Sequence, residues 1–139
     1  MYGPRQESSG EVGLIGVFAR TMLEGKQPKI FGTGEQERDF IFVDDVIDAN
    51  VLVLDRGDGT TYNIGSGKGA SVNKIFELYK RLLNYRWTPA YSPPRSGEVF
   101  KIILDSTKAC TELGWTAQVG LLTGHLFPIQ HGRFAIGMG

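Results

Sequence analysis

The chain has 139 residues, of which 41% are hydrophobic and 22% charged, which excludes wholesale disorder and fits one globular domain. Its 15 Lys and Arg residues balance its 15 Asp and Glu residues, so no net charge draws it to nucleic acid or an acidic membrane. Cys110 is the only cysteine, no apolar run reaches the roughly 18 residues of a membrane span, and the first ten residues lack the apolar centre of a signal peptide. We therefore expect a cytoplasmic protein that binds neither nucleic acid nor membrane.

The first half of the chain predicts helices that alternate with short strands. Residues 15–23 repeat apolar side chains at helical spacing, and Gly25 ends this helix. A short strand is expected at 29–31 and a second one at 40–43. The next helix covers 46–54, so the pattern is helix, strand, strand, helix.

The second half continues the alternation. A strand is expected at 62–64, followed by a helix from its N-cap Ser71 to Leu82. Two further strands are predicted at 90–92 and 99–104, and a last helix extends from its N-cap Ser106 to Leu113. Short connections between alternating elements predict an α/β fold with binding sites at the carboxyl ends of strands.

The stretch from Gly32 to Asp45 holds the leading candidate for a binding residue. Arg38 stands at the entrance of the 40–43 strand, which is apolar on both faces, as in a strand buried on both sides. A permanent cation at the end of a buried strand favours anion binding, with phosphate the first choice. A surface arginine paired with a neighbouring carboxylate is the alternative. Asp44 and Asp45 are expected to cap the following helix.

A glycine-rich loop, Gly65 to Ser71, lies between a predicted strand and a predicted helix. Its backbone amides could cradle a phosphate, as in nucleotide hydrolases with a phosphate loop. However, Gly69 stands where that motif needs Ser or Thr, and Tyr62 where it needs its first glycine. A tight turn with permissive glycines explains the loop better.

A second arginine, Arg95, follows Pro93 and Pro94. Two prolines restrict the loop and lower the entropic cost of holding Arg95 in one place. Arg38 and Arg95 could therefore grip a diphosphate from two sides, since each guanidinium offers paired donors to phosphate oxygens.

The sequence gives no sign of a catalytic or metal-binding group. His125 and His131 lie in a region without periodicity, and no spacing of His and Cys fits a metal site. No Ser or Cys stands near a His in a nucleophile motif. The residues alone therefore predict a binding surface without catalytic machinery.

Six motifs in order give the chain a family resemblance. They are YGPRQ at 2–6, PKIFGTG at 28–34, QERDFIFVDD at 36–45, YNIGSG at 62–67, PPRSGE at 93–98 and LGW at 113–115. This series resembles the C-terminal half of the NAD-dependent epimerase/dehydratase family. These proteins are extended short-chain dehydrogenases that act on nucleotide sugars, and UDP-glucose 4-epimerase is their best-known member. The resemblance implies the C-terminal portion of an extended Rossmann-type fold.

The resemblance also implies roles for individual residues. Arg38 and Arg95 match the two arginines that hold the nucleotide diphosphate. Val72 matches an apolar residue near the base, and Glu98 matches an acidic residue near the ribose. The strand that receives the uracil is matched by Lys29, Ile30 and Phe31. Near the nicotinamide ring of NAD, the matching residues are Tyr2 and Pro4.

Two features of the family are absent from this sequence, namely the glycine-rich NAD fingerprint and the catalytic Tyr-x-x-x-Lys. We therefore expect the substrate-binding half of an NAD-dependent nucleotide-sugar epimerase or dehydratase, catalytically incomplete as this chain. The alternative is a non-catalytic nucleotide-binding or interaction module derived from such an enzyme. Residues 1–127 form the expected nucleotide-sugar-binding part, and 128–139 an atypical, loosely ordered tail. The parent enzyme is expected to be a homodimer and the isolated chain to self-associate through its exposed surfaces.

Overall fold

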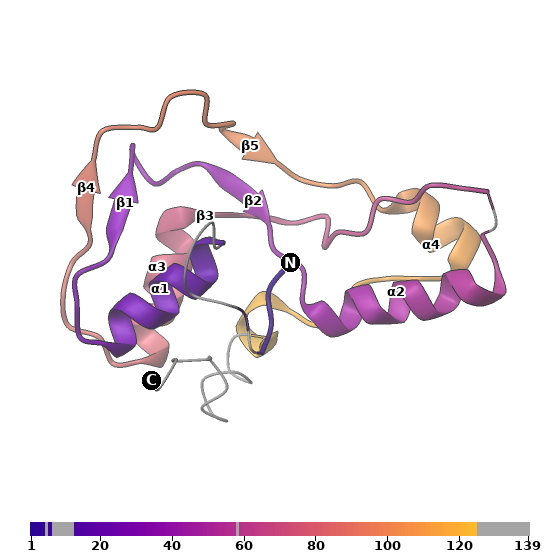
Figure 1. The fold of residues 1–139 in the computed structure, drawn as a ribbon, viewed down its shortest axis with the longest axis horizontal. Coiled ribbons are helices and arrows are strands. Elements are labelled where there is room, and N and C mark those ends of the chain that lie inside the picture. Colours follow the sequence, from indigo (N-terminus) through magenta and orange to yellow (C-terminus); the bar gives the residue numbers. More distant parts are fainter. Residues whose placement is uncertain (5, 7–12, 58, 125–139) are drawn as a thin grey trace.

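Helices and short strands alternate along the chain in the computed structural model, which describes residues 1–4, 6, 13–57 and 59–124 (Figure 1). The predicted α/β class is confirmed. The elements, in chain order, are α1 (Leu14–Leu23), β1 (Lys29–Phe31), β2 (Glu37–Asp39), α2 (Val43–Asp55), β3 (Gly69–Ser71), α3 (Val72–Leu82), β4 (Ala90–Ser92), β5 (Lys101–Ile102) and α4 (Thr107–Leu113).

The strands form two small sheets. In the first, β1 pairs in parallel with β4, and Ile30 lies opposite Tyr91. In the second, the order is β3-β2-β5, with β2 antiparallel to β3 and parallel to β5. Arg38 lies in the central strand, opposite Ala70 on one side and Ile102 on the other. The second sheet therefore fixes the backbone of the residue that the sequence singled out.

The strand predicted at 40–43 is displaced. Strand β2 ends at Asp39, and α2 already begins at Val43, so only an isolated bridge between Tyr2 and Phe42 remains. The predicted burial on two sides still holds for three residues, because Phe40 and Phe42 pack on the larger core cluster and Ile41 on the smaller one. Val43 departs from the alternation and packs with the larger cluster, since it is the first residue of a helix.

Two other strand predictions need correction. Residues 62–64 form no strand, since no described segment pairs with them, and Tyr62 and Ile64 instead pack against the smaller core cluster. Strand β3 lies further along, at the end of the glycine-rich loop. The strand predicted over 99–104 is paired only at β5, where β2 lies beside it.

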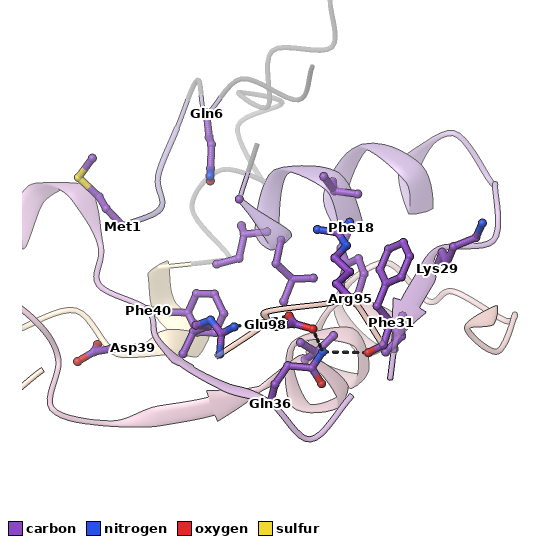
Figure 2. Close-up of a pocket in the computed structure, with 17 residues that line it drawn as sticks. Met1, Gln6, Phe18, Lys29, Phe31, Gln36, Asp39, Phe40, Arg95 and Glu98 are labelled. Carbon is purple, nitrogen blue, oxygen red and sulfur yellow. Dashed lines mark hydrogen bonds and ion pairs between the residues drawn. The ribbon is translucent and has the colours of Figure 1, made fainter. Parts of the chain in front are cut away.

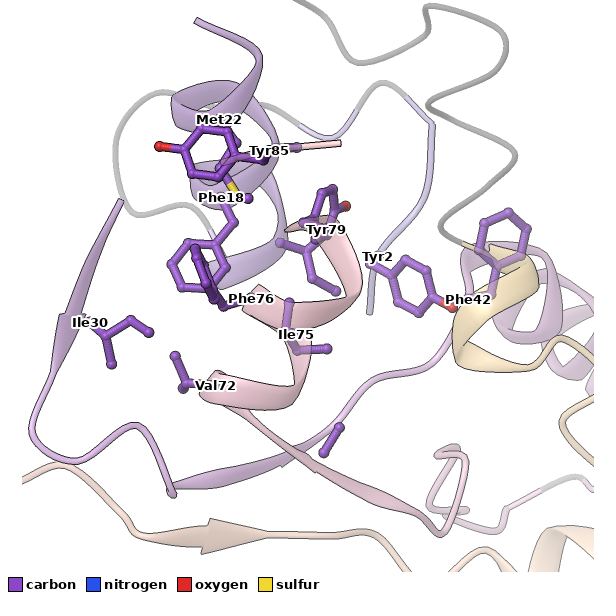
Figure 3. Close-up of a cluster of buried hydrophobic side chains, with 13 residues drawn as sticks. Tyr2, Phe18, Met22, Ile30, Phe42, Val72, Ile75, Phe76, Tyr79 and Tyr85 are labelled. Atoms are coloured by element: carbon purple, nitrogen blue, oxygen red, sulfur yellow. The ribbon is translucent and has the colours of Figure 1, made fainter. Parts of the chain in front are cut away.

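The larger core cluster joins α1, α3 and the inner face of β1. It contains thirteen buried residues of the described chain, and Figure 3 shows Phe18, Met22 and Phe76 where the two helices meet, with Tyr2 and Phe42 further to one side. The rings of Phe18 and Phe76 meet edge to face, with centroids 6.2 Å apart and an interplanar angle of 87°. Ser71 caps α3 as predicted, because its hydroxyl accepts a hydrogen bond from the amide of Lys74 (3.2 Å).

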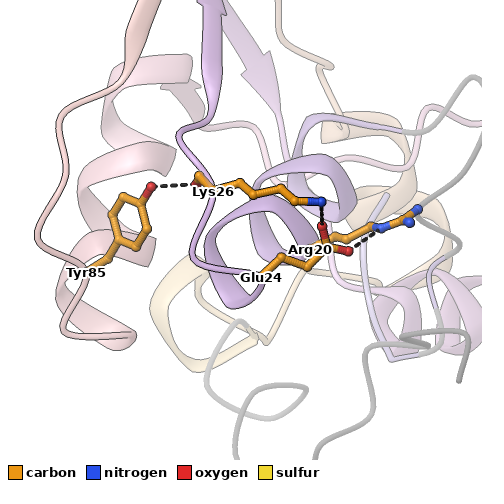
Figure 4. A network of polar contacts seen from close by, with 4 residues as sticks. All are labelled: Arg20, Glu24, Lys26 and Tyr85. Carbon is orange, nitrogen blue, oxygen red and sulfur yellow. Dashed lines mark hydrogen bonds and ion pairs between the residues drawn. The ribbon is translucent and has the colours of Figure 1, made fainter.

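Polar contacts close the outer end of this cluster (Figure 4). The hydroxyl of Tyr85 donates to the carbonyl of Lys26 over 2.5 Å, so the segment after α3 is tied to the connection between α1 and β1. The carboxylate of Glu24 accepts from Lys26 (2.7 Å) and from Arg20 (2.9 Å) on the surface. Gly25, with φ of 69°, ends α1 as the sequence predicts.

The smaller core cluster lies between α2 and α4 and holds five buried residues of the described chain. Asp45 is at its edge, but it does not cap α2: its carboxylate accepts from the amides of Gln118 (2.9 Å) and Val119 (3.1 Å). The backbone carbonyl of Asp45 accepts from the indole of Trp115 (2.8 Å). Asp45 therefore fastens the segment after α4 to α2 instead of stabilising the first turn alone.

The capping prediction for Ser106 is also wrong in its detail. Helix α4 begins directly after Ser106, but the hydroxyl of Ser106 exchanges hydrogen bonds with the backbone of Gly65 (2.9 and 3.0 Å). The carboxylate of Asp105 accepts from the amide of Thr107 (2.9 Å) in its place. The two hydrogen bonds between Ser106 and Gly65 connect the start of α4 to the glycine-rich loop.

One face of α2 is apolar and open. Ile47, Val51 and Leu54 are 51%, 55% and 82% exposed, and their spacing places them on one side of the helix. Within the described residues, no helix combines the length and apolar character needed to cross a membrane. The predicted tail at 128–139 lies outside the described residues.

Candidate functional site

A cavity of about 440 Å³ lies among α1, β1, β2 and the loop that contains Arg95 and Glu98 (Figure 2). All seven residues to which the family resemblance gives a nucleotide-binding role line this cavity: Lys29, Ile30, Phe31, Arg38, Val72, Arg95 and Glu98. They come from four separate stretches of the sequence (29–31, 38, 72 and 95–98), so the fold brings together residues that are distant along the chain.

Arg38 is held by backbone groups and by one carboxylate. One guanidinium nitrogen, Nη1, donates to the carbonyl oxygen of Glu37 (2.8 Å) and to that of Phe100 (3.4 Å). The other, Nη2, lies 3.5 Å from Oε1 of Glu98, and the side chain is 28% exposed. Its carboxylate partner is therefore Glu98, from a distant part of the chain, and not one of its neighbours at 35, 37 or 39. The geometry leaves Arg38 oriented at the cavity wall.

Arg95 reaches the same cavity from the opposite loop. Its guanidinium carbon lies 4.1 Å from the centroid of the Phe31 ring, so the cation rests on the aromatic face. The backbone turns back between Arg95 and Glu98, where the Glu98 amide donates to the Arg95 carbonyl (3.4 Å). Stacking on Phe31 restricts Arg95 in addition to the two preceding prolines.

The base of the cavity is formed by β1 and the start of α3. Ile30 and Val72 are buried, whereas Lys29 is exposed at the rim. Strand β1 pairs with β4 on one side only among the described residues, so its other edge borders the cavity. An open strand edge presents backbone amides and carbonyls that can recognise a planar polar group.

Gln36 is a cavity residue to which sequence reasoning gave no role. It is 6% exposed, and its side-chain nitrogen donates to the carbonyl of Phe31 (2.9 Å) and to Oε2 of Glu98 (3.3 Å). Figure 2 marks both bonds with dashed lines. The available signal was a glutamine inside the QERDF motif, two residues before Arg38 and on the same side of β2.

The glycine-rich loop is organised around an internal carboxylate. Asp39 accepts hydrogen bonds from the backbone amides of Ser66 (2.8 Å), Gly67 (3.0 Å) and Leu104 (3.2 Å). The amides that a phosphate would use are therefore occupied by a side chain of the same chain. This geometry supports the interpretation of the loop as a structural turn and speaks against a phosphate-loop hydrolase.

Tyr2 and Pro4, matched to the surroundings of NAD, do not line this cavity. The ring of Tyr2 is 3% exposed and packs edge to face on Phe42 at 5.5 Å. The backbone amide of Tyr2 donates to Ile41 and its carbonyl accepts from Val43, both over 2.9 Å. Both the ring and the backbone of Tyr2 are therefore engaged in contacts within the fold.

The buried tyrosines are poor bases. Burial raises the pKa of the Tyr2 hydroxyl above its ordinary value, and the charge of Asp45 raises it further. Burial also raises the pKa of Tyr79, with Tyr2 as the second cause. Both hydroxyls stay protonated at neutral pH, so neither suits proton abstraction. Among the described residues, no group of three His, Cys, Asp or Glu could hold a metal ion.

Nucleotide-sugar enzymes are among the known proteins similar to this chain in sequence and fold. Residues 1–65 match the sequence model of the NAD dependent epimerase/dehydratase family. The UDP-glucose 4-epimerase of Mycolicibacterium smegmatis is 38% identical over 125 residues, which is 89% of this chain and 40% of that protein. The chain is therefore similar in sequence and fold to members of the NAD dependent epimerase/dehydratase family.

Two solved structures show the same fold. The UDP-glucose 4-epimerase of Thermotoga maritima, solved with UDP-glucose, superimposes with a TM-score of 0.91 at 45% identity, over 95% of this chain and 43% of that one. The UDP-glucose 4-epimerase of Thermus thermophilus, solved with NAD, gives a TM-score of 0.83 at 30% identity, over 97% and 44%. The chain therefore spans about two fifths of the length of these relatives.

Proposed function

We propose that this chain is the substrate-binding half of an NAD-dependent nucleotide-sugar epimerase or dehydratase similar to UDP-glucose 4-epimerase. The observation that carries the proposal is the convergence on one cavity of all seven residues to which the family resemblance gives a nucleotide-binding role. The similarity to the Thermotoga maritima enzyme, which was solved with UDP-glucose, favours a UDP-sugar as the substrate class.

In this proposal the two arginines hold the diphosphate. Arg38 is anchored through Nη1 to backbone carbonyls and presents the rest of its guanidinium to the cavity, while Arg95 is steadied on the face of Phe31. Two pre-oriented guanidinium groups lose little side-chain freedom on binding and offer paired donors to phosphate oxygens. The diphosphate grip is therefore the main source of affinity.

The uridine part is recognised by the rest of the cavity. The edge of β1 that faces the cavity, at Lys29 and Phe31, receives the uracil, with the Phe31 carbonyl also bonded to Gln36, and Val72 packs against the base. Glu98 accepts a hydrogen bond from a ribose hydroxyl. Each contact uses a residue that already lines the cavity, so binding needs only small side-chain movements.

NAD is the cofactor that the family uses, but the residues of this chain do not by themselves fit it. Of the two matched residues, Tyr2 has its ring in the core and its backbone groups bonded to Ile41 and Val43. We propose that the NAD site is not formed by this chain alone. When bound, NAD supplies the hydride acceptor, while the chain described here positions the sugar nucleotide through remote contacts.

We propose further that the chain alone does not catalyse epimerisation. Its sequence contains no Tyr-x-x-x-Lys, and the pKa values of Tyr2 and Tyr79 are raised rather than lowered. Incubation of the purified chain with UDP-glucose and NAD should give no UDP-galactose. The second candidate is a non-catalytic nucleotide-binding or interaction module derived from such an enzyme, and we propose a cytoplasmic location for the chain in either case.

Calorimetry with UDP tests the proposed site. Arg38→Ala and Arg95→Ala should each weaken UDP binding by about tenfold to a hundredfold, because a hydrogen bond to a charged group contributes roughly 1.5–3 kcal/mol. Arg86→Ala is the matched control, since Arg86 is exposed and does not line the cavity. Binding of ATP in preference to UDP, or equal losses in all three variants, would contradict the proposal.

A further inference from the structure

Gln36 lines the candidate site and is buried among residues from several elements. Its backbone carbonyl accepts from the amide of Val72 (3.2 Å), which joins the residue to the start of α3. Its side-chain nitrogen is shared between the carbonyl of Phe31 and the carboxylate of Glu98. Gln36 thus connects the strand edge proposed for the base with the carboxylate proposed for the ribose.

The carboxylate of Glu98 lies between the side chains of Gln36 and Arg38 and forms a short contact with neither. Its Oε2 is 3.3 Å from the amide of Gln36, and its Oε1 is 3.5 Å from Nη2 of Arg38. Close charge-assisted pairs typically measure about 2.7–2.9 Å. Other ion pairs in this chain reach that range, such as the 2.8 Å pair of Lys101 and Glu37. The separation between Arg38 and Glu98 is therefore long.

The position of Glu98 decides how much of Arg38 a ligand can use. Backbone carbonyls fix the guanidinium on one side through Nη1. If the Glu98 carboxylate closed on the other side as a paired ion, it would compete with the diphosphate for the same donors. A side chain that holds the Glu98 carboxylate away from Arg38 therefore leaves the Nη2 donors of Arg38 available to the diphosphate.

We propose that Gln36 is this positioning residue: by hydrogen bonding the Glu98 carboxylate, it prevents a closed Arg38–Glu98 ion pair and keeps Arg38 available for the substrate diphosphate. The inference rests on the proposed function of the cavity. Gln36 acts through Glu98 and does not itself contact the phosphates.

The test compares Gln36→Met with Gln118→Met in the full 139-residue chain. Gln118 serves as the control because it does not line the cavity and, among the described residues, its side chain bonds only to Thr116. Calorimetry with inorganic pyrophosphate and UDP should show that Gln36→Met weakens the binding of both about fivefold to tenfold, the effect of roughly one hydrogen bond, whereas Gln118→Met leaves both near the wild-type values. Unchanged pyrophosphate affinity in Gln36→Met, or an equal loss in Gln118→Met, would overturn the inference.

A double-mutant cycle identifies the route of the effect. Glu98→Gln removes the competing charge, so pyrophosphate binding should strengthen several-fold and uridine binding should weaken. In the Glu98→Gln background, Gln36→Met should no longer change pyrophosphate affinity, because its effect passes through the carboxylate. The same loss in both backgrounds would contradict the inference.

Crystal structures of the unliganded chain give a readout that does not depend on ligand binding. In Gln36→Met, Arg38 and Glu98 should approach to about 2.9 Å, the distance of a closed ion pair. An unchanged separation would overturn the inference whatever the ligand data show. If this closure occurs but the wild-type chain binds neither UDP nor pyrophosphate, the proposed function fails and the positioning role of Gln36 stands.

Discussion

The region around α1 and α3 and the region around α2 and α4 differ in how completely they bury their apolar residues. The first contains thirteen buried residues of the described chain and provides the floor of the cavity through Ile30 and Val72. The second contains five, and α2 leaves Ile47, Val51 and Leu54 exposed. The binding site therefore rests on the well-packed region, whereas the exposed face lies on the other.

The largest expected effect comes from a cavity in the well-packed region. Phe76→Ala removes a buried ring that meets both Phe18 and Tyr85, so it should lower the free energy of unfolding by about 3–5 kcal/mol. UDP binding should weaken too, because Val72 and Ile30 belong to the same cluster. Denaturant unfolding and calorimetry measure the two quantities.

The counterpart substitution is Leu113→Ala in the smaller cluster. It should lower the free energy of unfolding by about 2–4 kcal/mol but leave UDP affinity unchanged under conditions where the chain is folded, since no member of this cluster lines the cavity. If Leu113→Ala weakens UDP binding as much as Phe76→Ala does, the two regions do not have the separate roles described above.

The apolar face of α2 should make the isolated chain self-associate. Replacing both Ile47 and Leu54 by Lys should shift sedimentation at tens of micromolar towards the monomer, because charges on an exposed apolar face oppose its burial between copies. Trp87→Lys is the control, as Trp87 is 61% exposed in the other region. A wild-type chain that sediments as a monomer, or an equal response to Trp87→Lys, would rule out the α2 face.

The smallest expected effect is electrostatic and lies at the outer end of α1. Hydrogen bonds from Lys26 and then Arg20 lower the pKa of Glu24 below its ordinary value. Because the folded-state pKa is lowered, the contribution of Glu24 to stability is present above the unfolded-state pKa and is lost as pH falls through the folded-state value. Glu24→Gln should thus lower Tm slightly at pH 7 and leave it unchanged in strong acid, with Asp48→Asn as the control. A Tm difference that persists in acid would exclude this origin.

Sequence reasoning located the helices and β1 well because apolar spacing and turn residues act locally. It misplaced the strands at 40–43 and 62–64, since a strand forms only where a partner lies beside it, and among the described residues the backbone of 40–42 bridges only to Tyr2. The roles of Asp39 and Asp45 were missed for the same reason. Their carboxylates bind amides 27 or more residues away along the chain, which no local pattern reveals.

The candidate site, like the fold, was predictable from the sequence only in part. The family resemblance named seven residues of the cavity wall, but it did not show that Glu98 lies between Arg38 and Gln36. The role of Gln36 depends on its burial and on two bonds to residues from other elements, and both arise only when the chain is folded. The QERDF motif placed a glutamine near Arg38, but it did not show that Gln36 is buried or which residues it bonds.

A crystal structure of the chain with UDP tests the central claim most directly. The diphosphate should lie between Arg38 and Arg95, with the uracil against the edge of β1 beside Phe31. A diphosphate bound instead at the amides of Ser66 and Gly67, with Asp39 displaced, would contradict the proposed site.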